Sequence, residues 1–156
     1  MEFIEEVNKP NIVSEVELIY RSKVKLSMRP LIRCAGDAYN ILLKHWEKEK
    51  IEFIEQFKVL YLNRGNRVLA INTISSGGLT GTVADPRLIF ATALKLNATA
   101  LILSHNHPSG NLSPSESDKV LTEKIKNAGK FLDIQVSDHI IVSSEGFFSF
   151  ADEGLL

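Results

Sequence analysis

Apolar residues along the chain form short runs whose spacing predicts strands. The runs 57–62 and 68–74 flank a polar segment, 63–67, and this arrangement predicts a β-hairpin. The run 99–104 is apolar without alternation, so we expect a strand that is buried on both faces, at the centre of a sheet. Further strands are expected over 131–136, 139–142 and 147–150.

A second spacing, close to the helical period, predicts three helices. The first covers 37–50, with Asp37 as its N-cap. The second starts with Asp85 as N-cap and Pro86 at the first helical position, and it is expected to end near residue 97. The third covers 115–129 and ends at a glycine. Alternation of these helices with the strands predicts an α/β fold, in which chemistry gathers at the carboxyl ends of strands.

The first 30 residues differ from the rest and are expected to form a separate, partly basic arm ahead of a domain over 31–156. Residues 1–12 lack periodicity and are expected to be loosely held, whereas 13–25 approximate the alternation of a strand. Five basic residues and no acidic one lie between Arg21 and Arg33. They favour an edge strand protected by charge over a nucleic-acid surface, because no aromatic residues are interleaved with them.

Composition narrows the class of protein. A length of 156 residues suits one domain, and 44% apolar with 24% charged residues is ordinary for a globular protein. No apolar run is long enough to cross a membrane, and the acidic N-terminus does not resemble a secretory signal, so we expect a cytoplasmic protein. The lone Cys34 excludes an internal disulfide. A net charge of −1 gives no overall attraction for nucleic acid, and the glycines of 77–81 do not match a nucleotide-binding spacing.

Two of the four histidines, His105 and His107, directly follow the predicted central strand. In extended backbone, residues two apart share a face, so both imidazoles can reach one ion while Asn106 points away. A catalytic zinc takes three nitrogen or oxygen ligands from the protein and keeps a fourth position for water. Asp118 is the nearby carboxylate that fits as the third ligand.

Asp118 also has a purely structural interpretation, because Ser115 and Asp118 match a helix capping box. A better box starts two residues earlier, with Ser113 as N-cap, Pro114 at the first helical position and Glu116 at the third. That cap would free Ser115 and Asp118, which share a helical face, to contact an oxyanion and a metal ion respectively.

The pattern His105-x-His107-Pro108 followed by Ser115-x-x-Asp118 resembles the motif of JAMM/MPN metalloproteases. The variant His-Asn-His-Pro-Ser-Gly over 105–110 is similar to the RadC-like JAB branch, with similarity from about Ile32 to the C-terminus. The resemblance implies a single-domain α/β fold of the JAMM/MPN (cytidine-deaminase-like) type, with a mixed β-sheet flanked by α-helices.

The same resemblance implies roles for individual residues. It implies that the two motif histidines and the aspartate hold Zn²⁺ with a water in the fourth place, and that Ser115 helps to stabilise the oxyanion. It also implies an upstream glutamate as general base, for which Glu52 and Glu55 are candidates. We choose Glu55 because it directly precedes the first apolar strand. His139 is expected to be structural or to orient a neighbouring residue, and His45 is expected to be a surface histidine.

Three functions are compatible with these features. The favoured one is a zinc hydrolase that acts on an amide or isopeptide bond of a protein or peptide substrate. A DNA-associated repair or mobile-element accessory is supported only by the basic residues of 21–33. It is weakened because longer RadC-like proteins carry a helix-hairpin-helix region for which this chain has no room. A non-catalytic scaffold would be expected to have lost its metal ligands.

Overall fold

A mixed five-stranded sheet forms the centre of the computed structural model, which describes residues 13–17, 19–77 and 83–156. The strand order is β2-β1-β3-β4-β5, and β3 pairs parallel with β4 while the other neighbours pair antiparallel. The strands are β1 (Gln56–Leu62), β2 (Val68–Ser76), β3 (Ala100–Asn106), β4 (Gln135–Val142) and β5 (Phe147–Ser149). The expected hairpin and the expected mixed α/β sheet are therefore confirmed.

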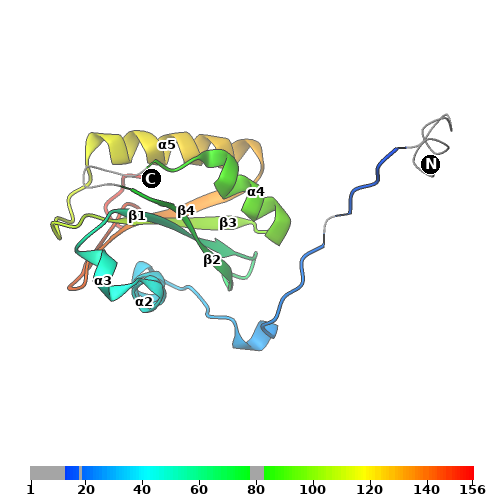
Figure 1. The fold of residues 1–156 in the computed structure, drawn as a ribbon, viewed down its shortest axis with the longest axis horizontal. Helices are drawn as coiled ribbons and strands as arrows, with labels where there is room; N and C mark the ends of the chain where they lie inside the picture. The colour runs from blue at the N-terminus through cyan, green and yellow to red at the C-terminus, as the bar shows by residue number, and fades with distance from the viewer. Residues whose placement is uncertain (1–12, 18, 78–82) are drawn as a thin grey trace, which may run out of the picture.

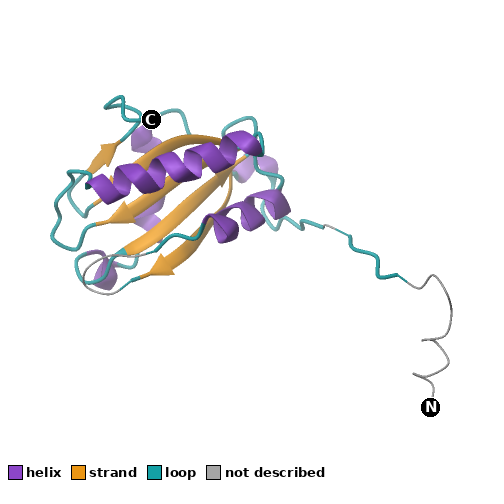
Figure 2. Ribbon diagram, turned by 90° about the horizontal axis from the view of Figure 1, so that it is seen from above, coloured by secondary structure: helices purple, strands orange, loops and turns teal. Residues whose placement is uncertain are grey.

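Helices cover both faces of the sheet, as Figures 1 and 2 show. One face, here called the α4/α5 face, lies under α4 and α5; the other lies under α2 and α3. The helices are α2 (Ala35–His45), α3 (Lys48–Ile51), α4 (Pro86–Leu96) and α5 (Glu116–Phe131), and a 3₁₀ helix, η1, covers Leu26–Met28. No helix in the described part of the chain combines the length and apolarity needed to span a membrane.

Strand β3 is the central element, because both of its edges are paired and all seven of its residues are buried. Alternate side chains serve the two cores: Leu101 and Leu103 pack on the α4/α5 face, and Ile102 packs under α2. The strand extends two residues beyond the predicted end. Pairing of His105 with β1 on one side and β4 on the other explains this extension, so the first motif histidine lies within the sheet.

The predicted helix over 37–50 is wrong in its start and its length. Cys34 is the N-cap, and Asp37 is the third helical residue, whose carboxylate accepts a bond from the Arg33 backbone N–H at 2.9 Å. The helix breaks at Trp46, where the backbone becomes extended, and α3 follows as a separate turn. This break buries the indole against the sheet, where the Lys58 ammonium lies 5.1 Å from the ring centroid.

The boundary between α5 and β4 also differs from the prediction. Gly129 lies inside α5 and is required by a close approach, because a Cβ atom there would lie 2.3 Å from the Ile134 carbonyl oxygen. The two strands expected over 131–136 and 139–142 are one strand, β4. Residues 131–134 instead complete the helix and turn the chain, with Asp133 in the left-handed region. By contrast, the predicted Asp85 cap of α4 is confirmed by its bond from the Arg87 N–H at 2.9 Å.

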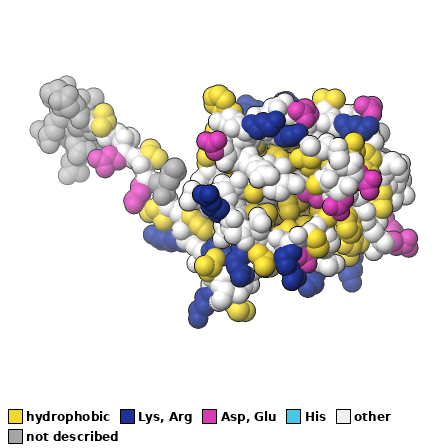
Figure 3. All heavy atoms as spheres, turned by 180° about the vertical axis from the view of Figure 1, so that it is seen from behind, with side chains coloured by type: hydrophobic (Ala, Val, Ile, Leu, Met, Phe, Trp, Pro, Cys, Tyr) yellow, Lys and Arg dark blue, Asp and Glu magenta, His cyan; other side chains and the backbone are white. Residues whose placement is uncertain are grey.

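The segment before the domain does not form the predicted strand over 13–25. The described residues of 13–25 are exposed and have neither helix nor strand conformation, and an isolated β-bridge joins Leu31 to Arg67, which lies just before β2. The alternating pattern does not produce a strand here because, within the described part of the chain, no strand pairs with residues 13–25. The expectation for 1–12 and most of the glycine-rich segment 77–81 fall outside the described residues. Charged side chains of both signs occur together on the face seen in Figure 3.

Candidate metal centre

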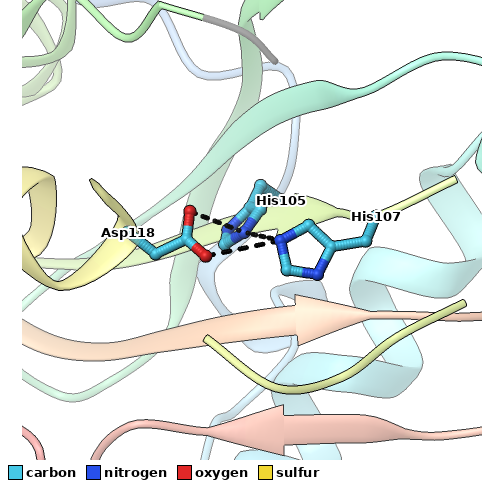
Figure 4. Close-up of side chains that lie close together, drawn as sticks. All are labelled: His105, His107 and Asp118. Carbon is cyan, nitrogen blue, oxygen red and sulfur yellow. Dashed lines mark hydrogen bonds and ion pairs between the residues drawn. The ribbon is translucent and has the colours of Figure 1, made fainter. Parts of the chain in front are cut away.

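Three side chains from two elements meet on the α4/α5 face at the carboxyl end of β3 (Figure 4). His105 belongs to β3, His107 follows that strand directly, and Asp118 lies in the first turn of α5. His105 Nε2 lies 3.2 Å from Asp118 Oδ1, and His107 Nε2 lies 3.3 Å from Asp118 Oδ2. The two Nε2 atoms are 3.0 Å apart. The structure therefore brings together all three predicted ligands, and this cluster can hold a metal ion.

The hydrogen bond on the far side of the His107 ring determines what the ring presents to the cluster. His107 Nδ1 lies 2.6 Å from the Asn111 carbonyl oxygen, and a carbonyl oxygen only accepts, so Nδ1 carries the hydrogen. A neutral His107 then directs the Nε2 lone pair at the carboxylate. Lone pairs of nitrogen and oxygen face one another at this point, and such an arrangement requires a cation between them. A metal ion meets that requirement, and in its absence a proton does.

The charges of the cluster shift the pKa values of its members. Burial by itself raises the pKa of the Asp118 carboxyl, but the polar contacts with His105 and His107 outweigh burial and hold that pKa far below its usual range. The hydrogen bond to Asp118 raises the pKa of His107, and the charge of Glu55 contributes in the same direction. Asp118 is therefore an anion, which suits it to bind a cation.

The predicted cap of α5 at Ser113 is wrong, because Ser115 is the N-cap. Ser115 Oγ accepts from the Asp118 N–H at 3.1 Å, and the Asp118 carboxylate accepts from the Ser115 N–H at 2.7 Å, which completes a capping box. Ser113 instead donates its backbone N–H to Asn111 Oδ1 at 3.0 Å, in the preceding loop. The loop makes its own hydrogen bonds, and the N-cap consequently lies two residues later than predicted, with α5 starting at Glu116.

Asp118 combines the two roles that the sequence analysis treated as alternatives. A carboxylate offers about four lone-pair positions, so one can accept the capping bond while others face the histidines. The cap thereby fixes the carboxylate in the orientation that the cluster needs. Ser115 uses its oxygen for the cap, and its hydroxyl oxygen lies 2.8 Å from Ser117 Oγ. The cap consumes only an acceptor position, so the Ser115 hydroxyl hydrogen is available to a substrate when Ser117 is the donor in that contact.

The two candidate glutamates lie in different places. Glu55 is half-buried and immediately precedes β1. By strand alternation it shares the α4/α5 face with Phe57, whose register partner is His105. Glu52 is exposed, and its carboxylate accepts from the Ser144 hydroxyl at 3.1 Å. The placement of Glu55 agrees with our choice, and its role as general base stays a prediction.

The two remaining histidines differ sharply in environment. His139 is fully buried, and its Nε2 lies 2.8 Å from His105 Nδ1, which agrees with the expectation that it orients a neighbour. Its neighbour Asp138 is buried on the other side of β4, where burial raises the pKa of the carboxyl and the Ser149 hydroxyl donates to it at 2.7 Å. His45 is exposed, as predicted.

Sequence reasoning missed a supporting residue within the motif, Asn106. Its side chain is fully buried on the face opposite the histidines, where it accepts from the Gln56 N–H at 2.8 Å. It also donates to the carbonyl oxygens of Ile51 at 2.7 Å and Ile54 at 3.0 Å. These bonds fix the turn that carries Glu55. No local pattern in the sequence revealed it, because the apolar run ends at residue 104 and the partners of Asn106 lie 50 or more residues away.

Replacing Asn106 by alanine is expected to lower the free energy of unfolding by about 3 kcal/mol or more, because it leaves buried backbone groups of 51–56 without partners. Urea unfolding monitored by circular dichroism measures the change. Asn127→Ala, at an exposed position of α5, is the matched control and is expected to change stability by less than about 0.5 kcal/mol. An Asn106→Ala protein as stable as the control would show that the Asn106 hydrogen bonds do not stabilise the turn that carries Glu55.

Comparison with known proteins agrees with this geometry. Residues 32–155 match the family model described as "RadC-like JAB domain", and the chain therefore belongs to that family. The chain is similar to a "UPF0758 protein" of Flavobacterium johnsoniae, with 40% identity over 97% of this chain and 66% of the relative. It is also similar to "UPF0758 protein YfjY" of Escherichia coli strain K12, with 42% identity over 72% of each chain. This chain thus spans about two thirds of the length of the Flavobacterium relative.

Proposed function

We propose that this chain is a zinc-dependent hydrolase of the JAMM type that cleaves a peptide or isopeptide bond. The observation that carries the proposal is the convergence of His105 Nε2, His107 Nε2 and the Asp118 carboxylate within 4.8 Å of one another. Two imidazole nitrogens and one carboxylate are a donor set typical of catalytic zinc. Membership of the RadC-like JAB family adds support from an independent source.

The chain's own residues would hold the ion and leave it accessible. His105 is almost fully buried, whereas the side chains of His107 and Asp118 retain 18% and 13% exposure, so one side of the cluster is open to substrate. When bound, zinc polarises a carbonyl group and acidifies a water molecule that it coordinates. The three protein ligands leave a fourth position for that chemistry.

Glu55 and Ser115 supply the groups that move or stabilise charge. A carboxylate on the α4/α5 face, two residues before the Phe57 that pairs with His105, is suited to take the proton of the attacking water, and we assign this role to Glu55. The Ser115 hydroxyl can donate to the oxyanion as the carbonyl carbon of the substrate becomes tetrahedral, because the cap uses this hydroxyl only as an acceptor. The proton held by Glu55 can then pass to the leaving amine.

An amide carbonyl is the substrate group that this arrangement suits, and we therefore propose a protein or peptide substrate. A cytoplasmic location is part of the same proposal. The alternative of a DNA-associated accessory rests only on the basic residues of 21–33, and no contact within the metal centre supports it.

A screen of peptide and isopeptide-linked substrates tests the proposal. The protein loaded with zinc is expected to cleave at least one member, to lose activity when the metal is removed by a chelator, and to recover when zinc is restored. Cleavage that persists unchanged after complete metal removal would overturn the assignment.

A further inference from the structure

A buried polar chain lies beneath the metal centre and ends on two of its ligands. His139 of β4 is fully buried, with its ring held between Phe57 and Phe150 at centroid distances of 5.6 and 4.7 Å. His139 Nε2 contacts His105 Nδ1 at 2.8 Å, and His139 Nδ1 contacts Thr122 Oγ1 at 2.6 Å. Thr122 Oγ1 in turn lies 2.6 Å from the backbone carbonyl oxygen of Asp118.

The direction of these hydrogen bonds follows from their last member. The Asp118 carbonyl oxygen only accepts, so the Thr122 hydroxyl must donate its hydrogen there. The Thr122 oxygen is then the acceptor toward His139, and His139 Nδ1 must carry a hydrogen. The donor and acceptor in every hydrogen bond of this buried series are therefore determined by one backbone carbonyl group of α5.

The position of the hydrogen on the His139 ring determines which atom donates in the bond between His139 and His105. The His139 ring is fully buried between two aromatic rings, an environment that favours a neutral imidazole with a single hydrogen. With that hydrogen on Nδ1, His139 Nε2 accepts, and His105 must donate from its own Nδ1. The lone pair of His105 Nε2 then points toward Asp118.

We propose that His139 and Thr122 are positioning residues that hold His105 in its Nδ1–H tautomer and keep its Nε2 free to bind metal. The opposite tautomer would gain a different hydrogen bond, because an Nε2–H of His105 would donate to the Asp118 carboxylate at 3.2 Å. That bond would occupy the ligand atom. The buried hydrogen bonds oppose this Nε2–H tautomer, since a reversed order of donors and acceptors would leave polar atoms of His139 and Thr122 without correct partners.

The same series of buried hydrogen bonds also connects two of the metal ligands to each other. It begins at the side chain of His105 in β3 and ends at the backbone of Asp118 in α5, so strand, helix and the intervening β4 are connected by side-chain bonds. Partners of this kind fix the tautomer and orientation of a ligating histidine in other metal sites. The inference deepens the proposed function and rests on it for the identity of the metal.

Zinc affinity of the full chain, measured by competition with a chromophoric chelator, tests this role. Thr122→Val removes the hydroxyl with little change in shape, and it is expected to weaken zinc binding by roughly 10- to 100-fold. Thr122→Ser keeps the hydroxyl and is expected to retain affinity close to that of the wild type. Thr92→Val is the matched control, because Thr92 makes the same bond to the carbonyl group four residues earlier, at 3.0 Å, in α4. Unchanged affinity in Thr122→Val would overturn the inference.

Nitrogen NMR of the metal-free protein provides a second readout that a merely structural role would not change. In the wild type, His105 and His139 are both expected to show a protonated Nδ1 and an unprotonated Nε2. Thr122→Val is expected to shift His105 toward the Nε2–H form, and Thr122→Ser to restore the wild-type signals. A wild-type His105 that carries its hydrogen on Nε2 would contradict the inference.

The two readouts separate this inference from the proposed function, because neither uses hydrolysis. If no substrate is ever cleaved but Thr122→Val still weakens zinc binding, the hydrolase assignment fails and the positioning role stands. If the wild type binds no zinc, the metal assignment fails, and the tautomer of His105 in the metal-free protein still decides the positioning role.

Discussion

His107→Ala is expected to reduce bound zinc from about one ion per chain to nearly none. The variant removes one of three ligands while leaving His105 and Asp118 in place. It also removes the bond from the ring to the Asn111 carbonyl oxygen, so the loop after β3 loses an anchor. Metal analysis of protein dialysed against buffered zinc measures the stoichiometry directly.

The same variant is expected to lose the stabilisation that metal binding provides. Free zinc at 100 times its dissociation constant adds about 2.7 kcal/mol to the folded state, which corresponds to a rise in Tm of roughly 5–10 °C for a chain of this size. Scanning calorimetry with and without zinc is expected to show this rise in the wild type and not in His107→Ala. His45→Ala, which alters an exposed histidine outside the site, is expected to behave like the wild type. Equal zinc content in both variants would show that His107 is not a ligand.

Glu55→Gln is expected to lower the rate of substrate cleavage by about 10²- to 10⁴-fold while zinc remains bound. Glutamine preserves the size of the side chain but cannot accept a proton from water, and Glu55 is not one of the three clustered ligands. The separation of these two effects, activity lost and metal kept, is the expected signature of a general base. Steady-state kinetics and metal analysis on the same preparation measure both.

Glu52→Gln is the matched control, because the two glutamates are three residues apart but face different surroundings. The Glu52 carboxylate is exposed and bonded to Ser144. Its substitution is expected to leave both cleavage and metal content unchanged. If Glu52→Gln loses activity while Glu55→Gln does not, the assignment of the base must be reversed.

The pattern of apolar residues was sufficient to predict the central strand and the position of the motif at its end. The run 99–104 is apolar on both faces because β3 contacts two cores, and that property is visible in the sequence itself. The segment 13–25 shows the limit of such reasoning. Alternation of apolar and polar residues favours a strand only when a neighbouring strand is available, and no sequence pattern reports the availability of a neighbour.

The start of α5 illustrates a second limit. Both Ser113 and Ser115 satisfy the local pattern of an N-cap, and the choice between them depended on the hydrogen bonds of the preceding loop. The prediction for Asp118 treated the helix cap and the metal as alternative roles. The structure assigns the Asp118 carboxylate to the cap and to the cluster together, because a carboxylate has more acceptor positions than either role uses.

The supporting residues around the cluster were the least predictable part of the site. Thr122 lies four residues after Asp118 on the same helical face, which makes it a neighbour of the ligand, but its contact with His139 depends on how α5 packs on β4. Asn106 is similar, since its partners lie 50 or more residues away in sequence. Contacts of this range arise from tertiary packing, and a single sequence does not encode them as a local pattern.

Diffraction from crystals of the zinc-loaded protein, recorded on both sides of the zinc absorption edge, tests the central claim most directly. We expect one anomalous peak within bonding distance of His105 Nε2, His107 Nε2 and the Asp118 carboxylate, about 2.0–2.2 Å from each ligand atom. A zinc ion bound elsewhere on the chain, with this cluster free of metal, would contradict it.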